Sequence, residues 1–75
     1  MKIFILTCVN ENSELCSCKS YRTREEAQVA MLNQFNNERG NWTFGNLEYE
    51  EIDNNGAGIG NEGYCYEWKI TEDEL

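Results

Sequence analysis

The acidic residues of this chain are the ones whose type and spacing could support catalysis or binding. Residues 48–68 hold six of them and no Lys or Arg, and four glycines lie in the middle of the stretch. Two carboxylates can divide acid and base roles, a cluster can hold a cation, and a row of negative charges can bind a basic surface. The six acids are Glu48, Glu50, Glu51, Asp53, Glu62 and Glu67.

Catalysis is the least favoured of these three uses. The chain has no histidine, so it lacks the commonest general base and the usual activator of a cysteine nucleophile. A carboxylate pair such as Glu50 and Glu67 on an open sheet face would stay solvated, which does not tune an acid for catalysis. A chain of 75 residues also leaves little room for a pocket. We therefore expect neither an enzyme nor a bound cofactor.

Two segments resemble ligand-binding loops. Residues 58–63 spell G-x-G-x-x-G, but a dinucleotide site needs that motif between a strand and a helix, and here a strand is expected to follow. Asp53 begins a run similar to the start of a calcium loop. An EF-hand has a glutamate at its twelfth position, however, and Glu62 falls at the tenth. Both segments are more typical of a hairpin loop over 53–63.

The four cysteines, Cys8, Cys16, Cys18 and Cys65, could in principle bind a metal or form disulfides. Zinc sites usually separate two cysteines by two to four residues, and one residue separates Cys16 from Cys18. A hairpin loop of Glu11–Ser13 would place Cys8 opposite Cys16, whereas loops of two or four residues would not. We expect free thiols that pack as small apolar side chains, and no metal. A thiol-dependent metal or redox role is the alternative.

The net charge is confined to the C-terminal part of the chain. Residues 1–43 contain five acids and five bases, whereas residues 44–75 contain nine acids and the single base Lys69, which accounts for the formal charge of −8. Direct binding of nucleic acid is disfavoured because phosphates are attracted by Lys and Arg. A basic protein partner is favoured.

The elements that must position the acids are mostly strands. Apolar and β-branched residues predict strands over 2–9 and 14–21 that form a hairpin. Thr23 is a predicted N-cap with Glu26 three residues later, and a helix is expected over 24–39. Two more strands are expected over about 44–52 and 64–71, joined by the 53–63 loop, and 72–75 is expected to be a frayed acidic tail.

These elements predict a single α+β domain over residues 1–75. The expected layout is ββαββ, an antiparallel four-stranded sheet with one helix packed on one face. On the last strand Tyr64, Tyr66, Trp68 and Ile70 alternate with polar residues, so this row is expected to face the helix. On the strand before it, Glu48 and Glu50 would share one face at a spacing of about 6.8 Å, and Glu51 with Asp53 the other.

Two runs of sequence carry a resemblance to a known class of proteins. "SYRTREEAQVAMLNQF" (20–35) and "EWKITEDE" (67–74) resemble segments of small acidic proteins from phages and mobile elements of gut bacteria. Short acidic proteins of that kind are similar in style to anti-CRISPR and anti-restriction inhibitors, several of which mimic nucleic acid. The resemblance implies an inhibitor of a host nucleic-acid enzyme, most plausibly a CRISPR nuclease. It assigns no site residue.

Charge and resemblance together predict a non-catalytic phage-type inhibitor. Its acidic hairpin would occupy a basic, nucleic-acid-binding groove of a host protein. An exposed sheet edge supports the alternative of a small adaptor or homodimer. No membrane association is expected, and a cytoplasmic location in a bacterial host is predicted because neither a signal peptide nor a spanning segment is evident. The predicted partner-binding residues are Glu48, Glu50, Glu51, Asp53, Glu62, Tyr64 and Glu67.

Overall fold

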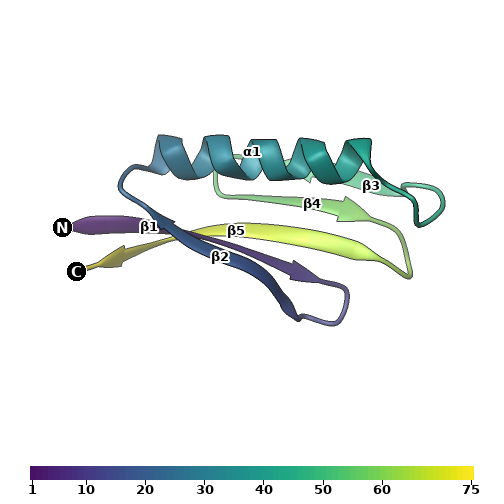
Figure 1. Cartoon of the computed structure of the whole chain (residues 1–75), viewed down its shortest axis with the longest axis horizontal. Helices are drawn as coiled ribbons and strands as arrows, with labels where there is room; N and C mark the ends of the chain where they lie inside the picture. The colour runs from purple at the N-terminus through teal and green to yellow at the C-terminus, as the bar shows by residue number, and fades with distance from the viewer.

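The two longest strands pair in the centre of the sheet. In the computed structural model, which describes residues 1–75, β1 (Lys2–Asn10) and β5 (Cys65–Glu74) run antiparallel from the pair Lys2 and Glu74 to the pair Asn10 and Tyr66. β5 carries apolar side chains at alternating positions, which suits a sheet with one buried face, whereas β1 carries them on both faces. The chain termini therefore lie side by side at one end of the molecule (Figure 1).

Five strands and one helix make up the fold. The sheet order is β2-β1-β5-β4-β3, and every neighbouring pair is antiparallel. The helix α1 lies across one face of this sheet (Figure 1). Its length and composition do not meet what a membrane-crossing helix requires. The remaining elements are β2 (Leu15–Tyr21), α1 (Arg24–Gly40), β3 (Tyr49–Ile52) and β4 (Gly56–Gly60).

The predicted four-stranded ββαββ layout is wrong. The segment expected to be a loop over 53–63 contains β4, which lies between β3 and β5 and pairs with both. Its alternation of glycine with Ala57 and Ile59 has the period of a strand, and pairing on both edges offsets the weakness of glycine in a strand. The strand expected over 44–52 shortens to β3, and the tail expected to be frayed belongs to β5 as far as Glu74.

The helix begins where its sequence predicts. Thr23 has an extended backbone, and its Oγ1 accepts a hydrogen bond of 3.1 Å from the backbone N–H of Glu26. Satisfying this free N–H stabilises the first turn. At the other end Gly40 is the last helical residue and Asn41 is the cap, so the helix runs one residue beyond the predicted 24–39.

A small core lies between the helix and the sheet. Trp68 is its largest member; its ring centroid lies 5.9 Å from that of Phe35, and its indole N–H donates to Oε1 of Gln34 at 3.0 Å. Tyr66, Trp68 and Ile70 face the helix as predicted, but Tyr64 precedes β5 and is 46% exposed. The fully buried apolar residues are Leu6, Cys8, Ala27, Met31, Phe35, Ile59, Trp68 and Ile70.

Candidate functional site

The acids of the C-terminal part are divided between the two faces of the sheet. Successive residues of a strand point to opposite faces, so Glu50 and Glu51 on β3 diverge. Glu50 lies on the helix side and forms an ion pair with the Arg39 guanidinium at the end of α1. Glu51 points to the open side, which α1 does not cover. The acids of this strand therefore lie on two surfaces, and Glu50 and Glu51 are on opposite faces as the alternation predicts.

On the open side, two carboxylates flank a glycine. Glu51 of β3 is paired with Gly58 of β4, and Gly58 is in turn paired with Glu67 of β5. The Cα atoms of Glu51 and Glu67 are therefore separated by two inter-strand spacings, roughly 10 Å. Because Gly58 has no side chain, nothing on β4 separates the two acids at this level of the sheet. Glu50 is on β3 and Glu67 is on β5. These two strands do not pair directly, because β4 lies between them.

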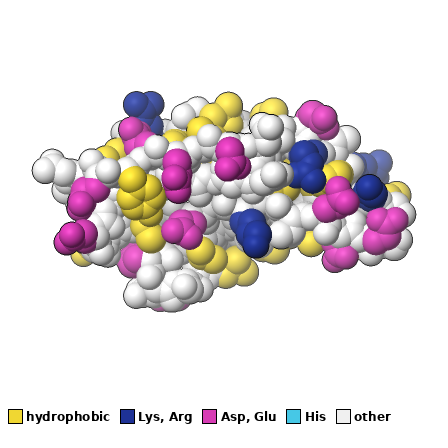
Figure 2. Space-filling model, turned by 180° about the vertical axis from the view of Figure 1, so that it is seen from behind, with side chains coloured by type: hydrophobic (Ala, Val, Ile, Leu, Met, Phe, Trp, Pro, Cys, Tyr) yellow, Lys and Arg dark blue, Asp and Glu magenta, His cyan; other side chains and the backbone are white.

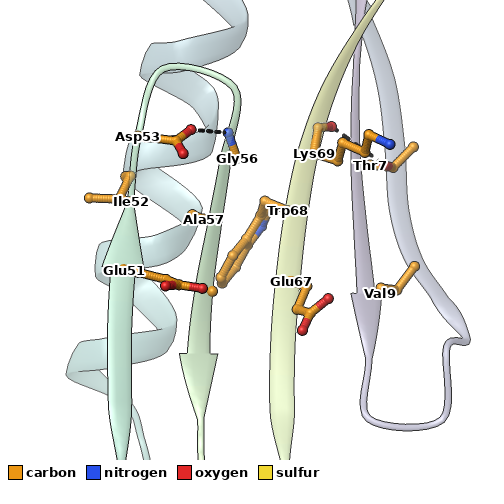
Figure 3. A pocket seen from close by; sticks show the side chains of 11 residues that line it. Thr7, Val9, Glu51, Ile52, Asp53, Gly56, Ala57, Glu67, Trp68 and Lys69 are labelled. Carbon is orange, nitrogen blue, oxygen red and sulfur yellow. Dashed lines mark hydrogen bonds between the residues drawn. The ribbon is translucent and has the colours of Figure 1, made fainter.

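The glycines of β4 form the floor of a groove in the open face. Gly56 and Gly58 lie in this floor, and the open cavity above them has a volume of about 520 Å³. Glu51 reaches from β3 over β4 (Figure 3), with its Oε1 3.6 Å from where a Cβ on Gly58 would lie. The residues around it that have side chains are Thr7, Val9, Glu51, Ile52, Asp53, Ala57, Glu67, Trp68 and Lys69. We call this feature the β4 groove.

Tyr49 experiences the negative potential at one end of this face. Burial is the largest of the causes that together raise the pKa of its phenol to about 12; hydrogen bonding with Cys65 and the charges of Glu67 and Glu51 act in the same direction. Each cause favours the neutral phenol. Tyr49 also lies against the floor, with Cε2 3.3 Å from where a Cβ on Gly58 would be.

Asp53 has a structural role in addition to its charge. Its Oδ1 accepts hydrogen bonds from the backbone N–H groups of Asn55 (2.8 Å) and Gly56 (2.9 Å), which closes the turn between β3 and β4. The turn is fixed to the helix because Gln28 donates to the carbonyl of Asn54 at 2.9 Å. The residues that resemble a calcium loop therefore form a tight turn tied to α1.

The other predicted contact residues lie at the turn between β4 and β5. Glu62 and Tyr64 both belong to this turn and are exposed. Glu48, just before β3, accepts a hydrogen bond of 3.2 Å from the backbone N–H of Glu62. Figure 2, the view from behind, shows Asp and Glu side chains on both halves of this face, with several on the half where this turn lies and Lys and Arg mostly on the other half.

Sequence reasoning did not find several residues of the β4 groove. Thr7, Val9 and Lys69 line it, and Gly56 and Gly58 create it. The signal that could have found them is the alternation G-A-G-I-G over 56–60, which has a strand period with no side chains on one face. Asp53, Glu51 and Glu67 were among the predicted residues and line the same cavity.

The cysteines are free thiols in different environments. Cys8 is buried, Cys65 is half-buried, and Cys16 and Cys18 are exposed. Cys8 pairs with Ser17, and the β1–β2 register shifts there so that Cys16 is the extra residue of a bulge. The pairing of Cys8 with Cys16 considered for one loop length is thus replaced by a bulge. No group of three or more His, Cys, Asp or Glu side chains is placed to hold a metal ion.

Alkaline pH is expected to weaken the fold. Burial, with smaller contributions from Cys16 and Glu38, raises the pKa of Cys8 from 9.0 to about 12, and that of Tyr49 rises from 10.0 to about 12. Because both values are higher in the folded protein, the stability they contribute is complete below about pH 9 and is lost as the pH rises toward 12. Urea midpoints should therefore fall between pH 8 and pH 11.

The variant Tyr49→Phe is the control for this pH dependence. It removes one titrating group from the open face, so its midpoint should fall less steeply above pH 10 than that of the parent. A parent protein with the same midpoint at pH 8 and pH 11 would contradict the argument.

Comparison of the chain with protein-family models, with curated proteins and with solved structures finds no match. The function must therefore be argued from the groove, its charges and the surfaces beside it.

Proposed function

We propose that this protein binds, without catalysis, a basic surface of another protein, and that the β4 groove is the centre of the contact. The observation that carries the proposal is the register that sets Glu51 and Glu67 on either side of Gly58. The Glu51 side chain lies over the backbone of Gly58, and Glu67 stands on the neighbouring strand β5, so a basic side chain of a partner can reach both carboxylates from the open face. Lys69 is the single base between residues 44 and 75.

The charges support a partner that ordinarily binds nucleic acid. Carboxylates that protrude from one face can occupy basic sites that otherwise bind phosphates, and so exclude the nucleic acid by competition. Glu51, Asp53 and Glu67 line the groove, and Glu48 and Glu62 lie at the neighbouring turn. Glu50 contributes less than its position in the sequence suggests, since Arg39 pairs with it. A CRISPR nuclease of a bacterial host is the first target to test, because the sequence resemblance points there.

Charge reversal in the groove tests the proposal. The double variant Glu51→Lys, Glu67→Lys should reduce capture of the partner from bacterial lysate by roughly 10-fold or more, since close charge pairs at interfaces are worth more than 1.4 kcal/mol. The matched control is Glu11→Lys with Glu14→Lys, which changes the net charge equally at the exposed turn between β1 and β2. The control should bind nearly as the parent does.

Salt provides the second arm of this experiment. Capture of a specific partner should be strong at low ionic strength and weak at high ionic strength, with the bound protein identified by mass spectrometry. Equal capture by the groove variant and the parent would show that the groove is the wrong surface. A partner whose binding ignores both salt and the variant would favour the exposed edge of β2 as the contact instead.

A further inference from the structure

Two exposed aromatic side chains stack where the loop before β3 meets the turn between β4 and β5. The ring centroids of Phe44 and Tyr64 lie 4.6 Å apart with an interplanar angle of 19°, and Trp42 packs edge-on against Phe44 at 5.4 Å. Phe44 is 41% exposed and Tyr64 is 46% exposed. Among these rings Phe44 has two aromatic neighbours and Tyr64 has one, so Tyr64 has the more open ring face. The core does not account for this exposed stack.

One amide side chain holds the stack in place. Asn61 donates from Nδ2 to the backbone carbonyls of Phe44 (2.9 Å) and Asn46 (3.1 Å). Its Oδ1 accepts from the backbone N–H groups of Gly63 (3.0 Å) and Tyr64 (2.9 Å). All four hydrogen bonds available to the amide are therefore made, and they join the loop before β3 to the turn after β4. The two rings are positioned before any partner arrives.

Negative charge lies next to the stacked rings. Glu62 is in the same turn as Tyr64, and the backbone N–H of Glu62 donates to Glu48, which brings the Glu48 carboxylate to this turn. No Lys or Arg occurs between Arg39 and Lys69. An aromatic face beside carboxylates matches one kind of side chain in particular. A guanidinium is a planar cation that stacks on aromatic rings and pairs with carboxylates, whereas an ammonium does not stack.

We propose that Phe44, Tyr64, Glu48 and Glu62 form a platform that receives an arginine side chain of the basic partner. The inference rests on the proposed function and adds to it the kind of residue that the partner presents. The β4 groove supplies the attraction between charges, and the platform discriminates arginine from lysine. The turn that carries Tyr64 joins β4 to β5, and the groove lies toward the other ends of these two strands, where Gly56 and Lys69 line it.

Two synthetic peptides serve as the probe, one alternating arginine with glycine and one alternating lysine with glycine over nine residues. Titration of the full chain by ¹⁵N NMR should give about 3- to 10-fold tighter binding of the arginine peptide. Its shifts should include the amides of Glu62 and Tyr64. Tyr64→Ala should bring the ratio of the two affinities close to one, while Tyr64→Phe, which keeps the ring, should retain the preference.

The outcomes separate this inference from the proposed function. Equal affinity for the two peptides, or a preference that survives Tyr64→Ala, would overturn the platform. If, in that case, the double variant Glu51→Lys, Glu67→Lys abolished binding of both peptides, the proposed role of the β4 groove would be supported and only the platform would be rejected. If neither peptide bound the parent, both the platform and the proposed function would be overturned. Dispersed amide resonances of Tyr64→Ala check that this exposed substitution leaves the fold intact.

Discussion

Replacement of Gly60 by alanine is expected to remove a large part of the stability of the fold. A Cβ at this position would lie 2.5 Å from both the Tyr64 carbonyl oxygen and the Cys65 Cβ, and 2.7 Å from the Cys65 Cα. Backbone atoms cannot move away without breaking the pair that Gly60 forms with Cys65. Overpacking costs about 1–3 kcal/mol where side chains can adjust, so we expect about 3 kcal/mol or more here. The total free energy of unfolding of a domain of this size is roughly 4–11 kcal/mol.

Gly58→Ala is the matched control, on the same strand and the same face. Its Cβ would meet the side chains of Tyr49 at 3.3 Å and Glu51 at 3.6 Å, and both side chains can rotate. Alanine is also less unfavourable than glycine inside a strand, so the net change should stay within about 1 kcal/mol. Urea denaturation followed by tryptophan fluorescence measures both variants. Equal losses at the two positions would contradict the account of β4 given above.

The strongly patterned elements could be predicted from the sequence. β1 followed from its run of apolar and β-branched residues, and it pairs with β2 in the predicted hairpin. Thr23 and Glu26 marked the helix start correctly because capping is a local interaction within one turn. The inward row of Tyr66, Trp68 and Ile70 followed from period-two alternation.

β4 could not be predicted by the same reasoning, because what stabilises it is not local. Three of its five residues are glycine, a composition typical of loops. Its stability comes from hydrogen bonding to β3 on one side and β5 on the other, and from the buried side chain of Ile59. Missing this strand altered the candidate site more than the fold class. Without β4, the predicted sheet placed the acids of β3 directly beside those of β5. In the structure the glycine-rich strand β4 lies between these two strands.

The candidate site was therefore predicted in part. The sequence singled out Glu51, Asp53 and Glu67 by their charge, and they do line one groove. The alternation placed Glu50 on the opposite face from Glu51 and Asp53, but it could not show that Arg39 pairs with Glu50, because that ion pair depends on how the end of the helix packs over β3. Nor could it show that Glu48 approaches the turn of Glu62, which lies 14 residues away in the chain.

Trp68→Ala is expected to produce the second large loss of stability. Trp68 is 3% exposed, packs against Phe35, and bonds to Gln34 through its indole N–H. Truncating a buried tryptophan removes apolar burial and leaves a cavity, which together cost about 3–5 kcal/mol. In a chain whose core comprises eight residues, neighbouring side chains can fill little of that space. Urea denaturation followed by circular dichroism is the measurement, since the substitution changes the fluorescence itself.

Trp42→Ala is the control for this substitution, and the comparison bears on function. Trp42 is only half-buried and donates its indole N–H to the carbonyl of Gly45, so its loss should destabilise the fold by less than Trp68→Ala does. Trp68 also borders the β4 groove. Its loss should therefore weaken partner binding together with the fold, whereas Glu51→Lys with Glu67→Lys should weaken binding in a protein that still unfolds near the parent midpoint. If Trp42→Ala were the more damaging change, the stability of the sheet would not depend on the core around Trp68.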